Sequence, residues 1–383
     1  MKAKMFDTID AYRDEMIALS DDIYDHPELA LKEYHAADVL IRCLEDKGCR
    51  VERGVGGLET AFRTQIKNLE GGPTIGLLAE YDALPGVHHA CGHHMQGPVM
   101  IAAFMALADC LPKDKPWTIV LYGTPGEEGG GGKVIMSENG CFKELDVALM
   151  MHGGDMTTYD PTMSANVSYK VTFTSGEAED IWNSPAFDAQ LITMHALEFM
   201  REHMPGNARI HYALSPVEQA QSVSANYMLR CLNDAYLDAM IARFNKALEG
   251  AALITGARCG IVPSHRLCAV FPNEPLAELF YKNAEEAGAE RIAPARGTMG
   301  STDFGNVMSI IPGFCARVAF APKGTGAHSL EWANAGKSLA AHNCVMTSAK
   351  LIAGMAYELI TEAGLVEKVH EDFIKQREKA NQT

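Results

Sequence analysis

The stretch from Ile75 to His94, IGLLAEYDALPGVHHACGHH, decides how the rest of the chain is interpreted. Its first half is an apolar run typical of a buried strand. Its second half contains glycine, cysteine and histidine, as expected of a turn that carries polar side chains. Cys91 and His93 stand two residues apart behind the strand, so a thiolate and an imidazole can point into one crevice. The stretch therefore predicts half of a metal site at the end of a strand.

Three further groups of metal-binding side chains follow other apolar runs. They are the adjacent carboxylates Glu127-Glu128, His152 behind the run ALMM, and His328 in GTGAHSLEW. A single histidine in such a place is more often a hydrogen-bonded core residue than a metal ligand. Each residue is therefore a candidate ligand only because the others are present. Together with Cys91 and His93, they form a candidate ligand set.

Apolar runs typical of strands alternate with helix-like segments in the first part of the chain. The runs are Thr74 to Glu80, Trp117 to Gly123 and Val147 to Met151, with helix-like segments such as Met100 to Leu111 between them. This alternation predicts an α/β domain with a mostly parallel sheet and helices on both faces. Loops at the carboxyl ends of such strands line the ligand crevice, and every candidate ligand lies in such a loop. Before these runs, Thr8 to Lys47 should be helical, with a break at His26-Pro27 that begins the next helix.

The pattern changes after about Ser168. Strand, helix, strand, strand, helix and strand follow in order, over Tyr169 to Thr174, Phe187 to His203, Ile210 to Leu214, Ala225 to Cys231, Tyr236 to Leu253, and Arg258 to Val262. This order predicts a two-layer α+β module of the ferredoxin-like kind. The helix Leu276 to Ala287 and the run Gly313 to Ala321 then resume the first domain. We therefore expect a domain made of residues 1–165 and 271–383, with residues 166–270 inserted into it.

The adjacent carboxylates can divide the work of a hydrolase. Neighbouring side chains point in different directions, so one of Glu127 and Glu128 can ligate a metal while the other faces substrate. Metal-assisted hydrolysis needs both, because an ion lowers the pKa of bound water to about 7 and a free carboxylate accepts and returns the proton. The glycines before Lys133 resemble a phosphate-binding loop, but that pattern fails at Glu127 and Val134.

Cys91 has two other interpretations, a buried structural thiol or a catalytic nucleophile paired with a histidine. The nucleophile is the weaker one, because nearby carboxylates would raise the pKa of the thiol unless a cation offset them. A metal ion supplies such a cation. His94 is close enough to tune the site. Five further histidines have no comparable context and are interpreted as structural or surface residues: His26, His35, His88, His89 and His195.

Composition limits the partners. The chain has 383 residues, 47% of them hydrophobic, and a formal net charge of −16, with acidic and basic residues interspersed. This charge argues against nucleic acid and anionic membrane surfaces, so we expect a small-molecule partner. No apolar run reaches the roughly 18 residues that span a bilayer. The charged N-terminus and ten cysteines without paired spacing favour the cytoplasm.

Seven sequence motifs match those of a known enzyme family. The chain resembles the dinuclear metallopeptidase superfamily of aminoacylases and zinc carboxypeptidases, and in it the amidohydrolase branch of p-aminobenzoyl-glutamate, hippurate and indole-acetyl-amino-acid hydrolases. The resemblance covers nearly the whole length. It rests on HPELALKEYHAADVL, LLAEYDALPGVHHACGHHMQG, GTPGEEGGGGKVIM, MMHGG, EGAALITG, GSTDFGNV and GTGAHSLEWANAGKS.

The resemblance implies a role for each candidate. Five residues would hold two divalent metal ions, zinc or manganese: Cys91, His93, Glu128, His152 and His328. Glu127 would be the general base and acid, and Asp82 would orient a ligand. The implied reaction is hydrolysis of the amide bond of an N-acyl amino acid, aryl-amide or dipeptide-like substrate. The inserted module would be the lid, and some relatives dimerise through it, here by way of the helix Ala186 to Met200.

The lid segment departs from the family pattern in three places. Asp180 stands where the family has a histidine that binds the developing oxyanion, AFDA replaces a longer stretch, and LSPVEQAQSVSA lacks the usual substrate loop. An ionised carboxylate would repel an oxyanion, and loss of such a stabiliser costs about 10²–10³ in rate. Asp180 could instead pair with a cationic portion of a substrate. The alternative to an enzyme is a metal-bearing binding or regulatory protein of the same fold.

Overall fold

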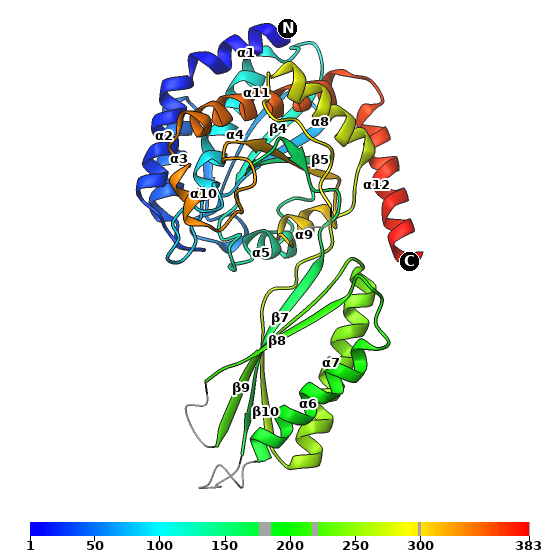
Figure 1. The fold of residues 1–383 in the computed structure, drawn as a ribbon. Coiled ribbons are helices and arrows are strands. Elements are labelled where there is room, and N and C mark those ends of the chain that lie inside the picture. The colour runs from blue at the N-terminus through cyan, green and yellow to red at the C-terminus, as the bar shows by residue number, and fades with distance from the viewer. Residues whose placement is uncertain (176–184, 217–220, 298–299, 383) are drawn as a thin grey trace. The chain divides into compact units, whose positions relative to one another are not determined.

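The computed structural model describes residues 1–175, 185–216, 221–297 and 300–382, and the chain divides into two compact units (Figure 1). Unit 1 comprises Met1–Pro161, Phe271–Met299 and Asn306–Lys379. Unit 2 comprises Thr162–Val270, Gly300–Gly305 and Ala380–Thr383. Unit 2 is thus largely one continuous insertion in the chain of unit 1.

Three helices open unit 1: α1 (Lys2–Ala11), α2 (Arg13–Asp25) and α3 (Tyr34–Asp46). The expectation that His26-Pro27 begins a helix is wrong, because residues 27–33 are extended and turn-like. Leu29 forms a parallel bridge with Ala83, and the backbone N–H of Ala83 donates to the carbonyl of Glu28 at 2.8 Å. Leu31 has a φ of 63°, which no helix interior accepts. Residues 27–33 therefore pack against the loop that contains Ala83, which follows the strand Thr74–Ala79.

The sheet of unit 1 has seven strands in the order β1-β2-β4-β3-β5-β11-β6. Their bounds are β1 (Val51–Arg53), β2 (Phe62–Asn68), β3 (Thr74–Ala79), β4 (Trp117–Gly123), β5 (Val147–Gly154), β6 (Thr158–Tyr159) and β11 (Gly313–Ala319). The four central strands β4, β3, β5 and β11 are parallel, as the sequence predicts, while β1, β2 and β6 are antiparallel to their neighbours and were not expected. Because the four central strands are parallel, their carboxyl ends lie at the same edge of the sheet.

Two long apolar helices cover this sheet and hold most of the core. Twelve of the fifteen residues of α4 (Gln96–Cys110) are buried, so it is apolar on all sides, as an interior helix must be. It packs against α11 (Leu339–Thr361), and both contact the parallel strands. The other helices of the unit are α5 (Gly132–Glu138), α8 (Glu274–Glu286), α10 (Leu330–Asn334) and α12 (Leu365–Gln382), with the short α9 (Phe304–Met308) at a unit boundary.

Unit 2 is a two-layer α+β structure with the predicted element order. Its elements are β7 (Ala165–Thr174), α6 (Pro185–Arg201), β8 (Arg209–Leu214), β9 (Ser222–Cys231), α7 (Asp234–Thr255) and β10 (Arg258–Pro263). The sheet is antiparallel in the order β10-β7-β9-β8, the arrangement of ferredoxin-like modules. Buried and more exposed side chains alternate along β7 and β9, because α6 and α7 cover only one face.

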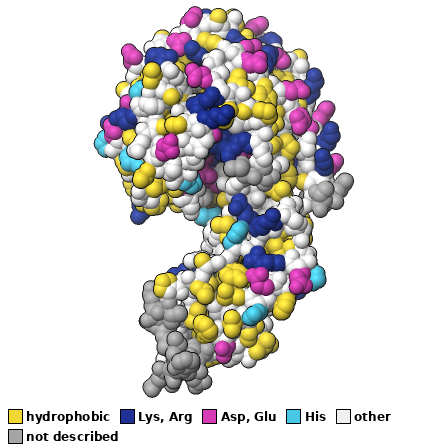
Figure 2. Space-filling view, viewed as in Figure 1, with side chains coloured by type: hydrophobic (Ala, Val, Ile, Leu, Met, Phe, Trp, Pro, Cys, Tyr) yellow, Lys and Arg dark blue, Asp and Glu magenta, His cyan; other side chains and the backbone are white. Residues whose placement is uncertain are grey.

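The surface carries both signs of charge side by side, as the interspersed sequence predicts (Figure 2). None of the described helices is both long and apolar enough to cross a membrane.

Candidate active site

The candidate ligands come from the ends of the four adjacent parallel strands. Cys91 and His93 follow β3, Glu127 and Glu128 follow β4, and His152 lies near the end of β5. His328 follows β11. Because these strands are neighbours and run in one direction, their carboxyl ends deliver all the side chains to one edge of the sheet.

The donor atoms of these residues lie close together in three overlapping groups. One ligand atom from each of Cys91, His93 and His152 lies within 4.8 Å of the others, and the same holds for Cys91, Glu128 and His328. A third group joins His93, Glu127 and Glu128. Cys91 Sγ lies 3.2 Å from His152 Nε2. The structure thus brings together all five predicted ligands and the predicted base.

Asp82 connects the two halves of this cluster. Its Oδ1 lies 3.0 Å from His93 Nδ1, and its Oδ2 accepts a hydrogen bond from the backbone N–H of Glu128 at 2.8 Å. Both Asp82 and His93 are fully buried. A carboxylate on Nδ1 fixes the ring and leaves Nε2 to face the cluster, which is the arrangement of histidines that bind metals.

His152 is oriented from the backbone and from the neighbouring strand. Its Nδ1 lies 2.7 Å from the carbonyl oxygen of Gly153, and its Nε2 faces Cys91. Arg317 of β11 is the register partner of His152, and its Nη1 lies 3.0 Å from the same Nδ1. Arg317 also pairs with Asp160. The sequence reasoning did not single out Arg317, because only the strand register reveals the contact.

His328 has a backbone conformation that few residues adopt. Its φ is 64°, in the left-handed region that costs a residue with a Cβ about 1 kcal/mol. The backbone N–H of His328 donates to the carbonyl of Ala90 at 2.9 Å, which ties this loop to the turn that carries Cys91. Its Nε2 lies 3.3 Å from Glu128 Oε1. Such conformations are held at sites where a side chain must be placed in one position.

A buried ion pair between Lys133 and Glu80, which the sequence did not predict, lies next to the cluster. Lys133 Nζ lies 2.6 Å from Glu80 Oε1, and both side chains are essentially inaccessible. The other oxygen of Glu80 accepts from Gln96 at 2.7 Å and lies 3.2 Å from His93 Nε2. The signal in the sequence was a charged residue, Glu80, directly after the apolar run of β3.

Local charge shifts the titration of several cluster residues. Burial alone would raise the pKa of Cys91, but His93 and His152 outweigh it and lower that pKa to about 6. Cys91 and Glu128 raise the pKa of His328 to about 10, against the effect of its partial burial. Burial also opposes the charge of Glu128, yet His328 and His93 hold its pKa below the usual range. The imidazoles of the cluster therefore favour the thiolate of Cys91 and the carboxylate of Glu128, which are the forms that bind metal ions.

The loop that carries Glu127 and Glu128 is built on close backbone contacts. A Cβ on Gly132 would lie 1.7 Å from the carbonyl oxygen of Pro125, so only glycine fits there. Gly126 and Gly130 face the side chain of Leu31, which a Cβ on either would meet at 2.7 and 2.9 Å. The segment before α3 thus forms the wall behind the acidic pair.

The donor set fits divalent metal ions. Nε2 of His93 and Oε1 of Glu128 are buried and make no hydrogen bond, although each lies at ion-pair distance from a neighbour. Buried polar atoms without a hydrogen bond are costly, and metal coordination would satisfy these two. Cys91, His93 and Glu128 each belong to two donor groups, and such sharing suits a pair of neighbouring ions. Thiolate, imidazole and carboxylate together suit zinc and similar borderline ions.

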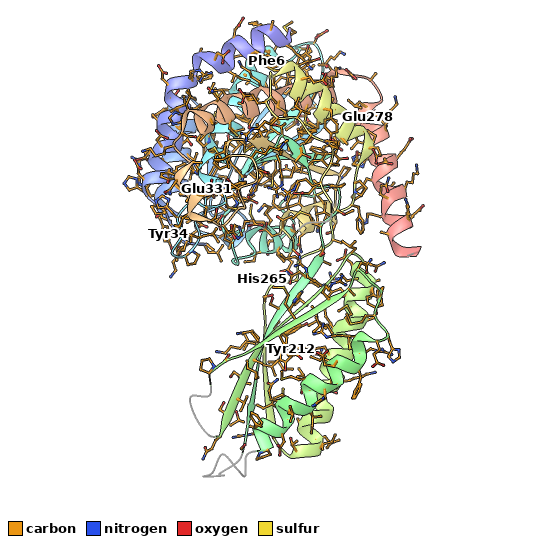
Figure 3. All side chains as sticks on the ribbon, in the orientation of Figure 1. Phe6, Tyr34, Tyr212, His265, Glu278 and Glu331 are labelled. Atoms are coloured by element: carbon orange, nitrogen blue, oxygen red, sulfur yellow. The ribbon has the colours of Figure 1, made fainter. Side chains whose placement is uncertain are left out.

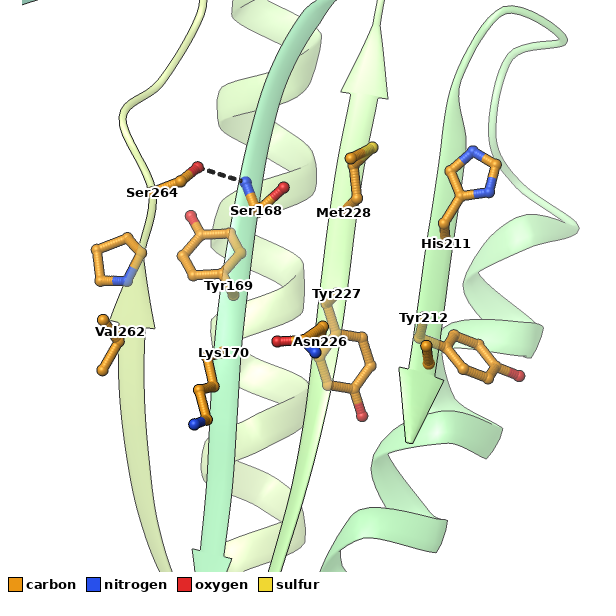
Figure 4. A pocket seen from close by; sticks show the side chains of 12 residues that line it. Ser168, Tyr169, Lys170, His211, Tyr212, Asn226, Tyr227, Met228, Val262 and Ser264 are labelled. Atoms are coloured by element: carbon orange, nitrogen blue, oxygen red, sulfur yellow. Dashed lines mark hydrogen bonds between the residues drawn. The ribbon is translucent and has the colours of Figure 1, made fainter. Parts of the chain in front are cut away.

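Unit 2 contributes a separate hollow, and none of the candidate site residues that the structure describes lines it. A pocket of about 490 Å³ lies on the face of its sheet away from α6 and α7 (Figure 4). Lys170, His211, Asn226 and Met228 are among its lining residues, and Ser264 Oγ accepts from the backbone N–H of Ser168 at 2.9 Å. Asp180, the predicted lid residue, lies outside the described residues.

Comparison with known proteins agrees with this geometry. Residues 76–339 match the sequence pattern of peptidase family M20/M25/M40. The chain is 30% identical to the Xaa-Arg dipeptidase of Mus musculus, over 97% of this chain and 92% of that protein. It is 28% identical to a p-aminobenzoyl-glutamate hydrolase polypeptide of Escherichia coli (strain K12), over 96% of this chain and 93% of that protein.

Solved structures show the same fold at lower identity. An aminobenzoyl-glutamate utilization protein from Klebsiella pneumoniae superposes with a TM-score of 0.72 at 15% identity, covering 92% of this chain and 98% of that one. A dinuclear metal binding peptidase of the M20 family from Bacillus subtilis gives 0.66 at 20% identity, covering 92% and 99%. The family match and the sequence relatives confirm the predicted family, and these structures confirm the predicted fold class. The chain therefore belongs to peptidase family M20/M25/M40, a family of hydrolases that cleave amide or peptide bonds.

Proposed function

We propose that the chain hydrolyses the amide bond of a small dipeptide-like or N-acyl amino acid substrate, with two divalent ions, zinc or manganese. The observation that carries the proposal is the meeting of six predicted residues at one edge of the sheet. Five are ligands, Cys91, His93, Glu128, His152 and His328, and the sixth is Glu127. A metal-bearing protein without turnover is not favoured, because the base stands in the cluster together with the complete ligand set.

Three of the ligand residues have supporting contacts that keep their donor atoms in place. Asp82 holds His93, the carbonyl of Gly153 holds His152, and the backbone of Ala90 holds the loop of His328. When bound, the ions would polarise the substrate carbonyl and make water a better nucleophile at neutral pH.

Glu127 is proposed to move the proton. Its carboxylate would take a proton from the attacking water and return it to the leaving nitrogen, while its neighbour Glu128 stays a ligand. The backbone turns tightly next to this pair, where Gly132 lies close to the carbonyl of Pro125. We propose that this turn keeps the two carboxylates pointing in different directions. The wall formed by Leu31 would limit access of bulk water from that side.

The substrate is proposed to be a dipeptide with a basic residue at its carboxyl end. Similarity to an Xaa-Arg dipeptidase over 97% of the chain supports this choice. So does the net charge of −16, which attracts cationic ligands. Asp180 is the proposed partner of the basic group, and residues 166–270 are the proposed lid.

The lid segment is also the proposed homodimer contact. Phe187, Leu191 and Phe199 of α6 are 46–65% exposed, so this helix offers large apolar side chains to a partner. Sedimentation equilibrium of the purified chain tests this, and a monomer at micromolar concentration would contradict it.

A substrate panel combined with metal analysis tests the central proposal. The panel holds Xaa-Arg and Xaa-Lys dipeptides, Xaa-Glu dipeptides, N-acetyl amino acids and p-aminobenzoyl-glutamate, with metal content measured by mass spectrometry. We expect two ions per chain, highest kcat/KM on the basic dipeptides, and a loss of about 10²–10⁴ in kcat for Glu127→Gln with both ions retained. Turnover that survives in Glu127→Gln would refute the base, and a protein that binds no ions would refute the site.

The basic-residue preference has its own variant. Asp180→Asn should lower kcat/KM on Xaa-Arg dipeptides while kcat/KM on neutral dipeptides changes little. An equal loss on both would show that Asp180 does not recognise the basic group.

A further inference from the structure

A second cluster of histidines and a carboxylate lies in unit 1, away from the residues assigned above. Asp22 stands in the last turn of α2, His26 caps the end of that helix, and His35 is the second residue of α3. One ligand atom from each of the three lies within 4.8 Å of the other two. From the sequence alone, both histidines were interpreted as structural or surface residues.

The contacts of the cluster converge on one residue, Asp22. Asp22 Oδ2 lies 2.8 Å from His35 Nε2, and Oδ1 lies 3.4 Å from His26 Nδ1. His26 Nδ1 also lies 2.8 Å from the backbone carbonyl oxygen of Asp22, a hydrogen bond that an ion on this nitrogen would displace. The two imidazole rings lie near each other, with centroids 4.3 Å apart. Within the described part of the chain, Asp22 forms ion pairs with these two histidines and with no lysine or arginine. No fixed cation of that part competes for the carboxylate.

The backbone around the cluster is already in place. Glu28 accepts hydrogen bonds from the N–H groups of His35 and Ala36, both at 3.0 Å, and so fixes the start of α3. His26 sits at the carboxyl end of α2, where the helix dipole favours positive charge. Tyr34, the neighbour of His35, lies at the periphery of unit 1 (Figure 3), and the side chains of the cluster are 33–55% exposed. Water can therefore fill the remaining coordination positions.

We propose that Asp22, His26 and His35 bind one borderline divalent ion of the Zn²⁺ or Cu²⁺ class, independently of the catalytic pair. Two imidazoles and one carboxylate with open positions are a ligand set that such ions accept. The ion joins the end of α2 to the start of α3 and so closes the loop 27–33 between them.

The closed loop is the one that supports the catalytic edge. It carries Leu29, which bridges Ala83, and Leu31, which packs against Gly126 and Gly130 beside the acidic pair. Occupancy of the outer site therefore stabilises the wall behind Glu127 and raises the thermal stability of the chain.

The test uses Cu²⁺ as a probe on the purified holoprotein with its own ions in place. We expect one added Cu²⁺ per chain, with nitrogen hyperfine structure from two imidazoles in its electron paramagnetic resonance spectrum. The double variant His26→Gln/His35→Gln should lose this signal and bind Cu²⁺ at least about tenfold more weakly, since loss of even an outer partner costs a metal site that much. Zn²⁺ should raise the Tm of the wild type and leave that of the variant unchanged.

A matched control separates a site from ordinary surface histidines. His342 also lies 3.0 Å from a carboxylate, Asp21, but none of the described histidines joins that pair in a ligand group. His342→Gln should keep the Cu²⁺ signal and affinity of the wild type. Equal binding by wild type and double variant would overturn the proposal, whether the copper then sits at the catalytic edge or elsewhere. Because metal content and turnover are measured separately, failure of this site leaves the proposed hydrolase untouched.

Discussion

Two histidine–carboxylate pairs in unit 1 have nearly the same geometry and very different surroundings. His93 and Asp82 lie 3.0 Å apart with both side chains fully buried, whereas His35 and Asp22 lie 2.8 Å apart with side chains 33% and 40% exposed. At the surface, water screens such a pair and it contributes about 0–1 kcal/mol. In the interior, every charge must be matched by a partner, so removal of one group affects all the others.

The strongest test of this difference is the buried lysine beneath the cluster. Lys133→Met leaves Glu80 buried without its cation, next to His93. We expect the free energy of unfolding to fall by about 3–5 kcal/mol, the usual cost of breaking a buried pair from one side. Urea denaturation at pH 7 measures this change.

The double variant Glu80→Gln/Lys133→Met is the control. It removes both charges together, so most of the lost stability should return. If the double variant is as unstable as Lys133→Met alone, packing of the lysine stem rather than its charge holds the site.

A second test uses pH and the buried carboxyl of Glu33. Burial and the nearby Asp82 raise the pKa of Glu33 to about 7, although it accepts hydrogen bonds from Thr60 and Leu31. A raised pKa means that the folded chain keeps this proton longer than the unfolded chain. The stability it contributes is present below about pH 4.5 and is lost as pH rises through about 7, by about 3 kcal/mol.

Glu33→Gln should remove this part of the pH dependence. Denaturation midpoints between pH 4.5 and 8 should fall more steeply in the wild type than in the variant. Glu59→Gln, at an exposed carboxyl that accepts from Tyr34, is the matched substitution for comparison. Parallel slopes for wild type and Glu33→Gln would contradict the shift.

The smallest expected effects come from the matched pair itself. Asp82→Asn should weaken binding of the catalytic ions by about 10–100-fold, because Asp82 fixes the ring of His93 and the N–H of Glu128. Asp22→Asn, with the same pairing at the surface, should leave the content of those ions unchanged and alter stability by less than about 1 kcal/mol. Metal content after dialysis against a weak chelator measures the effect of Asp82→Asn. Equal loss of metal from both variants would show that the buried and the exposed pair do not differ.

Much of the fold was predictable because its signals are local. The apolar runs that became β3, β4, β5 and β11, and the strand–helix order of unit 2, follow from hydrophobic patterning alone. The edge strands β1, β2 and β6 were missed because short strands with mixed polarity have a weak pattern. Residues 27–33 were assigned to a helix because their contact with Ala83 is not visible in the local sequence.

The site was predictable to the extent that its donors follow strands. Position behind an apolar run indicated Cys91, His93, His152, His328 and the pair Glu127-Glu128 as candidates. Only the resemblance to the family implied that Glu128 is the ligand of that pair. Arg317 and Lys133 could not be predicted, because their meaning comes from strand register and from burial of a charge. His26 and His35 are nine residues apart in the chain, and only the turn between α2 and α3 brings them to Asp22.

The buried helix α4 has a consequence for motion at the catalytic edge. The turn that carries Cys91 and His93 leads directly into this helix, whose residues are almost all inaccessible. We expect its backbone amides to exchange their hydrogens with solvent only in large openings of unit 1. The ligand turn is therefore anchored to a helix that should open rarely, and its geometry should persist through local fluctuations that loosen the outer helices.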